Sequence, residues 1–155
     1  MTAATQINPA VTSLPEPLAQ VAAPCEVPLL PTIAAGFPSP AGDYSVEEGL
    51  DLNQYLVNNP LSSYIFTVRG DSMVGAAILD GDKVVVDRAR TPRHRDIVVA
   101  VVDNQYTIKR LYRKDRRIEL HAENPDFSPI VFHEGMELVV WGVVTSVVRR
   151  ILPGA

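Results

Sequence analysis

The chain has 155 residues, of which 46% are hydrophobic and 21% charged, and a formal net charge of −4. This length and apolar content favour one globular domain and argue against a wholly disordered chain. No run approaches the ~20 consecutive apolar residues of a membrane-spanning helix, so we expect no membrane protein. The acidic balance argues against a protein whose entire surface grips nucleic acid.

Cysteine and histidine usage points to a protein without metal. The single cysteine, Cys25, cannot form an intramolecular disulfide, and His94, His121 and His133 match no metal-ligand spacing. We therefore expect no metal, no cofactor and a reducing, cytoplasmic location.

The first forty residues differ in composition from the rest. They hold eight of the thirteen prolines and no lysine or arginine. Prolines at this density prevent a helix of ordinary length, so residues 1–40 are predicted to form an extended, polyproline-like arm. Without a basic segment, and with prolines inside its apolar run, the arm does not read as a secretory signal. Residues 41–155 are predicted to form the folded domain.

The domain begins with a short helix and continues as strands. Leu52, Tyr55 and Leu56 recur at helical spacing after Asp51, a suitable N-cap, and Pro60 ends the run. Apolar and β-branched runs then predict six strands, over residues 64–69, 83–87, 97–102, 105–112, 117–121 and 138–148.

Turn signals separate these strands. Asp103-Asn104 and Lys114-Asp115 each suggest a tight hairpin, and Asp80-Gly81-Asp82 precedes a strand. Short strands with little helix predict a mainly β fold, a small antiparallel sheet or partly closed barrel.

The segment Gly70-Asp71-Ser72-Met73, directly after the first long strand, is the best candidate for chemistry. A serine in such a turn can present its hydroxyl beside backbone N–H groups, here those of Ser72 and Met73, that form an oxyanion hole. A Gly-Asp-Ser tripeptide by itself is more often only a turn.

A serine nucleophile needs a base. A Ser-His-Asp arrangement would recruit one of the three histidines, none of which has a recognisable context, and the other option is a neutral lysine. Lys114 lies in a predicted turn and Lys83 beside two aspartates, so both are expected to stay protonated. Lys109 lies mid-strand on the face of Thr107 and Leu111, where desolvation would lower its pKa. A strand lysine that extends into solvent is the alternative.

Several separated motifs resemble the LexA/UmuD family of self-cleaving Ser-Lys proteins, and most closely its UmuD branch, which acts in SOS mutagenesis. The resemblance runs from about Ala35 to the C-terminus and rests on residues 36–44, 50–54, 70–73, 80–82, 107–111 and 141–144.

This resemblance implies a LexA C-terminal-domain-like fold, with Ser72 as nucleophile and Lys109 as general base. It places the scissile bond between Ala35 and Gly36. It further implies a homodimer, activation by RecA filaments on single-stranded DNA, and a trimmed form that assists a UmuC-like Y-family polymerase in translesion synthesis.

Three other functions remain open on the sequence. These are a LexA-type repressor lacking its DNA-binding domain, a signal-peptidase-like enzyme, and an interaction module without catalysis. Whether the basic cluster Arg88–Arg95 is a solvated loop or contacts DNA or an acidic partner also stays open. Ala77 stands where the family usually has glycine, which would cost about 1 kcal/mol if φ is positive there.

Overall fold

The computed structural model describes residues 16–17, 23–29, 35–36, 49–115, 117–133 and 136–152. Its elements, in chain order, are β1 (Glu16–Pro17), β2 (Glu26–Pro28), β3 (Gly49–Asp51), α1 (Leu52–Leu56), β4 (Ser63–Thr67), the 3₁₀ turn η1 (Val74–Ala76), β5 (Lys83–Asp87), β6 (Ile97–Val102), β7 (Gln105–Lys114), β8 (Arg117–His121), β9 (Ile130–Phe132) and β10 (Val139–Val148).

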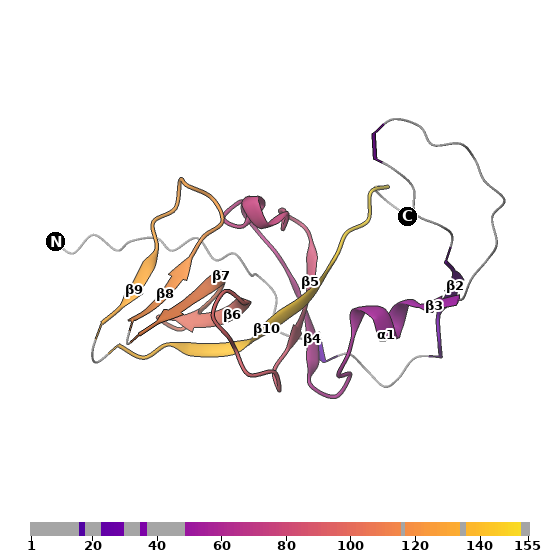
Figure 1. Ribbon diagram of the computed structural model, residues 1–155, viewed down its shortest axis with the longest axis horizontal. Helices are drawn as coiled ribbons and strands as arrows, with labels where there is room; N and C mark the ends of the chain where they lie inside the picture. Colours follow the sequence, from indigo (N-terminus) through magenta and orange to yellow (C-terminus); the bar gives the residue numbers. More distant parts are fainter. Residues whose placement is uncertain are drawn as a thin grey trace.

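Eight of the strands form one antiparallel sheet, in the order β1-β4-β5-β10-β6-β7-β8-β9, and β2 pairs with β3 separately (Figure 1). The predicted mainly β fold with one short helix is therefore confirmed. Within the described residues the large sheet is open, because its hydrogen-bonded order runs from β1 to β9 without returning. No described helix is long and apolar enough to cross a membrane.

Strand β10 is the bent centre of the sheet. It pairs with β6 through residues 139–143 and with β5 through residues 143–148, with a register shift in each ladder. Such shifts bend a strand and increase its twist. At Gly142 an added Cβ would lie 2.7 Å from Val86 Cγ1, so only glycine permits this close approach of β10 to β5.

Hydrophobic side chains fill both faces of the sheet. On β6, Val99 belongs to one buried cluster while Val98 and Ala100 belong to the other, as expected when alternate residues point to opposite faces. The first cluster includes Phe66, Met73, Ile78 and Ile108; the second includes Leu111, Leu120 and Val143. Because both faces are covered, residues in the middle of β7 are buried on either side.

Most predicted elements have their expected positions. The Asp51 side chain accepts a hydrogen bond from Asn53 N at 2.9 Å, which caps α1 as predicted. Strands β5, β6 and β8 match their predicted bounds, and β7 extends two residues further. Asp103 and Asn104 both have positive φ, which is typical of the predicted tight hairpin turn. The sequence pattern did not predict β9.

Two described segments of the first forty residues pair with the rest of the chain. β1 adds to the edge of β4, and β2 pairs with β3. Cys25 O accepts from Leu52 N at 3.0 Å, which joins the end of this second ladder to α1. In Figure 1, α1, β2 and β3 lie beyond β4 and β5, at the opposite end from β9. The predicted boundary near residue 40 lies outside the described residues and stays a prediction.

Candidate active site

The structure brings the predicted serine and lysine together. Ser72 lies in the turn between β4 and η1, and Lys109 lies in the middle of β7. Lys109 Nζ is 3.0 Å from Ser72 Oγ, and the two residues are only 7% and 6% exposed. This is the separation at which a base can take a hydroxyl proton.

The surroundings of Lys109 raise the fraction of neutral amine above that of a lysine in water. Burial lowers the pKa of Lys109 from 10.5 to about 8, because desolvation disfavours the charged form. At pH 7, a pKa near 8 leaves about one amine in ten neutral. The ammonium form donates hydrogen bonds to Ser72 Oγ and to Ile108 O, the latter at 3.0 Å.

A second buried hydroxyl lies two residues from Lys109. Thr107 is 1% exposed, and its Oγ1 has no hydrogen-bond partner within the described part of the chain. Thr107 and Lys109 point to the same face of β7. The predicted shared face of Thr107, Lys109 and Leu111 is buried throughout.

The backbone beyond Ser72 turns sharply. Met73 is buried in the first hydrophobic cluster, and its carbonyl accepts from Ala76 N at 2.9 Å and Ile78 N at 3.3 Å. Ala77 ends η1 with φ 59°, in the left-handed region. The position therefore has the positive φ that glycine suits better, at a cost of about 1 kcal/mol for alanine.

The backbone N–H groups of Ser72 and Met73 donate to no acceptor among the described residues. Free amides next to the hydroxyl are what an oxyanion hole requires. The oxyanion role of these two amides stays a prediction.

The segment after β8 is hydrogen-bonded to the backbone around Ser72, residues 70–76, which we call the serine turn. The sequence pattern did not predict this contact. Glu123 N donates to Ser72 O at 2.9 Å, and Gly75 N donates to Glu123 O at 2.7 Å. Asn124 Nδ2 also donates to Asp71 O at 3.0 Å. The Asn124-Pro125 dipeptide is a recognisable turn signal, yet nothing local indicates which distant segment it holds.

Two aspartates of the turn before β5 accept hydrogen bonds from backbone N–H groups that lie before and after Ser72 in the chain. Asp80 Oδ1 accepts from Gly70 N at 2.7 Å, and Asp82 Oδ2 accepts from Leu79 N at 2.7 Å. Asp82 also accepts two hydrogen bonds of 2.6 Å from Arg149. The hydrogen bond from that guanidinium keeps the pKa of Asp82 below its usual value.

The other candidate bases do not hydrogen-bond to Ser72. Lys83 is exposed and donates to Thr67 Oγ1, and Lys114 is exposed at the end of β7. His94 Nδ1 accepts from Arg113 N at 3.0 Å. The remaining histidines do not hydrogen-bond to Ser72 either: His121 pairs with Glu119 at 2.6 Å, and His133 is exposed.

The predicted scissile bond lies at the surface. Ala35 and Gly36 are both exposed, and a Cβ added to Gly36 would meet no atom within 4 Å. In this conformation the bond is not packed into a binding site, and its role as the cleavage site stays a prediction.

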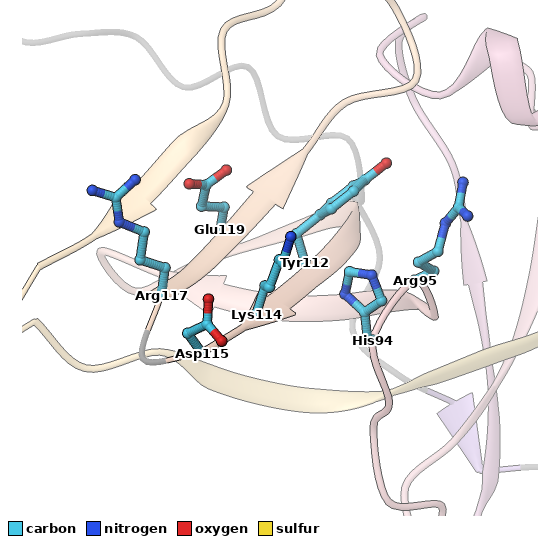
Figure 2. A pocket seen from close by; sticks show the side chains of 7 residues that line it. All are labelled: His94, Arg95, Tyr112, Lys114, Asp115, Arg117 and Glu119. Atoms are coloured by element: carbon cyan, nitrogen blue, oxygen red, sulfur yellow. The ribbon is translucent and has the colours of Figure 1, made fainter.

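One end of the basic cluster Arg88–Arg95 lies near the β7–β8 hairpin. A hollow of about 530 Å³ lies between the loop before β6 and the β7–β8 hairpin (Figure 2). It is lined by His94, Arg95, Tyr112, Lys114, Asp115, Arg117 and Glu119. Ser72 and Lys109 do not line it. Whether the Arg88–Arg95 cluster is a solvated loop or contacts DNA or an acidic partner stays open.

No three His, Cys, Asp or Glu side chains of the described ranges gather as a metal site would need.

Comparison with known proteins shows the family to which this sequence belongs. Residues 28–145 match the model of the S24-like peptidases. The chain belongs to the S24-like peptidase family. The matched span of this S24 family member contains Ser72, Lys109 and the Ala35–Gly36 bond.

Three relatives illustrate the breadth of the S24-like match. Protein ImpA of Salmonella typhimurium is 42% identical over 117 residues, 75% of this chain and 78% of that protein. Protein MucA of Escherichia coli is 44% identical over 117 residues, 75% of this chain and 79% of that protein. The LexA repressor of Syntrophotalea carbinolica is 40% identical over 125 residues, 81% of this chain but 60% of the repressor.

Proposed function

We propose that this chain is a Ser-Lys peptidase of the SOS response that cuts its own Ala35–Gly36 bond. The observation that carries the proposal is the 3.0 Å separation of Lys109 Nζ and Ser72 Oγ in a site that excludes most water. Membership of a peptidase family supports it independently.

The cleavage begins with nucleophilic attack. Neutral Lys109 takes the Ser72 proton as Oγ attacks the carbonyl carbon of Ala35. The amides of Ser72 and Met73 stabilise the oxyanion that develops on the Ala35 carbonyl oxygen. Collapse breaks the bond to Gly36 N, which receives a proton from the Lys109 ammonium.

The first half of the reaction leaves residues 1–35 esterified to Ser72, with Gly36 as a new N-terminus. Water, deprotonated by Lys109, then hydrolyses the ester and leaves Ala35 with a free carboxylate. No metal or cofactor enters either step.

Docking of the scissile segment is the step at which cleavage is controlled. Nucleophile and bond belong to one chain or one dimer, so a docked segment reacts at high effective concentration. The segment is exposed in this structure, so the docked conformation is a different state. A RecA filament on single-stranded DNA activates by favouring that state.

The trimmed product is proposed to act as a cytoplasmic homodimer that assists a UmuC-like Y-family polymerase in error-prone translesion synthesis. The similarity to ImpA and MucA, over more than three-quarters of each, supports this assignment over the repressor alternative. The match to a LexA repressor favours a second candidate, a self-cleaving repressor fragment. Specific binding of the full chain to operator DNA would select that candidate.

The test is the rate at which the fragment starting at Gly36 appears, with and without RecA filaments. Because Lys109 has a pKa of about 8, the rate without activator rises about tenfold per pH unit below that value and levels off above it. Ser72→Ala and Lys109→Ala each abolish the cut. A stable full-length chain from pH 6 to 10.5, with and without filaments, contradicts the proposal.

A further inference from the structure

Arg110 connects the strand of the proposed base to the segment that holds the serine turn. Arg110 follows Lys109 on β7, and its Nε donates to Glu123 Oε1. Its Nη1 donates to Arg95 O at 2.8 Å, so both ends of the guanidinium are engaged. The side chains of Arg110 and Glu123 are 23% and 26% exposed, which limits screening by water.

Glu123 in turn contacts the serine turn through its backbone at two places, Ser72 itself and Gly75 three residues later. Its N–H donates to Ser72 O at 2.9 Å, and its carbonyl accepts from Gly75 N at 2.7 Å. The fit is tight, because a Cβ on Gly75 would lie 2.6 Å from Glu123 O. A movement of Glu123 therefore moves the Ser72 backbone.

We infer that the Arg110–Glu123 ion pair is a positioning device that fixes Ser72 against Lys109, a role that rests on the proposed self-cleavage. The serine and the lysine lie on segments 37 residues apart. The ion pair joins those segments through one side-chain contact and two backbone hydrogen bonds. Arg110 is therefore engaged in this link by its side chain.

Loss of the link allows the serine turn to drift from the amine. A misplacement of about 1 Å costs on the order of 100-fold in rate, because the reacting atoms leave hydrogen-bond reach. A loosened turn also admits water to Lys109. Since burial is what lowers the pKa of that amine, the midpoint of the pH–rate profile then moves from about 8 toward 10.5.

The experiment compares Glu123→Ala with Glu119→Ala. Glu119 is a matched control: its side chain is 27% exposed, it pairs with His121 on β8, and it does not bond to the serine turn. Glu123→Ala is expected to slow release of the Gly36 fragment at pH 7.5 by about 10- to 100-fold and to move the midpoint upward. Glu119→Ala keeps the wild-type rate and midpoint.

A second variant and a second readout separate positioning from folding. Arg110→Lys keeps one donor and a charge, so it retains more activity than Arg110→Met, and thermal denaturation checks that each variant folds. In the uncleavable Ser72→Ala background, amide exchange at Gly75 is about tenfold faster when Glu123→Ala is added, because its acceptor is released.

The inference is overturned if Glu123→Ala and Arg110→Met keep the wild-type rate and a midpoint near 8, or if Glu119→Ala slows cleavage equally. A wild-type chain that never releases the Gly36 fragment contradicts the proposed function instead. In that case the Gly75 exchange rate still decides whether the ion pair holds the turn.

Discussion

The Ser72–Lys109 pair and the Ala35–Gly36 bond lie in opposite surroundings. The pair is buried and its hydroxyl and amine are already 3.0 Å apart. The bond is exposed, with nothing packed where a side chain of Gly36 would be. If the chain cleaves itself as proposed, the difference indicates that the reacting groups are organised in advance and that the substrate segment is not. On the proposed function, the slow and regulated step is therefore docking of the segment.

The largest effect on cleavage is expected from a change in the buried Ser72–Lys109 pair. Lys109→Met keeps the length of the side chain and removes the base, so no Gly36 fragment is expected at any pH. The variant is also expected to be more stable, because the wild-type amine is desolvated. A pKa depressed from 10.5 to about 8 corresponds to a penalty of about 3 kcal/mol.

The pH dependence of the free energy of unfolding tests whether burial of the Lys109 ammonium destabilises the protein. The folded pKa of Lys109 lies below its unfolded value, so the cost is complete below about pH 8 and disappears above about pH 10.5. Wild type should gain stability across this window while Lys109→Met does not. Urea unfolding at pH 7 and pH 10.5 measures both; an equal difference between the two proteins at both pH values would contradict the burial argument.

A bulky side chain at the exposed residue Ala35 is expected to have the next largest effect on the cleavage rate. Ala35→Trp should slow cleavage by about 100-fold, since the residue before the scissile bond must enter the space beside Ser72. Ala35 is exposed in the undocked state, so the melting temperature should not change. Ala35→Ser serves as the small control and should cleave normally. Normal cleavage of Ala35→Trp would remove Ala35–Gly36 as the cut site.

A methyl group added at Gly75 tests whether the backbone around Ser72 must stay in its observed position for cleavage. Gly75→Ala must displace Glu123 O from a 2.6 Å contact, so we expect cleavage to slow about tenfold and stability to fall by about 1–3 kcal/mol. Gly49→Ala is the control, because its added Cβ meets only ordinary contacts of 3.6 Å. Fragment release and thermal melting are the measurements; equal behaviour of the two variants would show that the turn tolerates movement.

The smallest effect on cleavage is expected at Asp82, which accepts hydrogen bonds from Leu79 N and Arg149 and does not hydrogen-bond to Ser72 or Lys109. Asp82→Asn should lower stability at pH 7 by about 1–2 kcal/mol, discounted for the exposed Arg149 guanidinium, and change the cleavage rate less than threefold. The pKa of Asp82 is lowered in the folded state, so its contribution is complete above 3.8 and is lost as pH falls through the folded pKa. Wild type and variant should therefore converge in acid, which melting curves at pH 7 and pH 3 would test.

Much of the fold followed from local pattern. The apolar runs predicted β5 and β6 to the residue, because strands covered on both faces read as continuous hydrophobic stretches. Alternation of Ile118 and Leu120 with polar residues predicted β8 to the residue. The pairing of β2 with β3 was missed, since in both segments it rests on backbone hydrogen bonds and not on hydrophobic periodicity. β9 has only three residues, too few to display a period.

By itself the sequence determined which residues carry reactive groups: a serine in a turn after a strand, and a lysine inside an apolar strand. Only the tertiary structure decided that Ser72 Oγ and Lys109 Nζ meet, that burial lowers the pKa of the amine, and that Glu123 and Arg110 link their two segments. The physical reason is that reactivity depends on distance and solvent exclusion. Both arise from contacts between residues far apart in the chain, which no local pattern records.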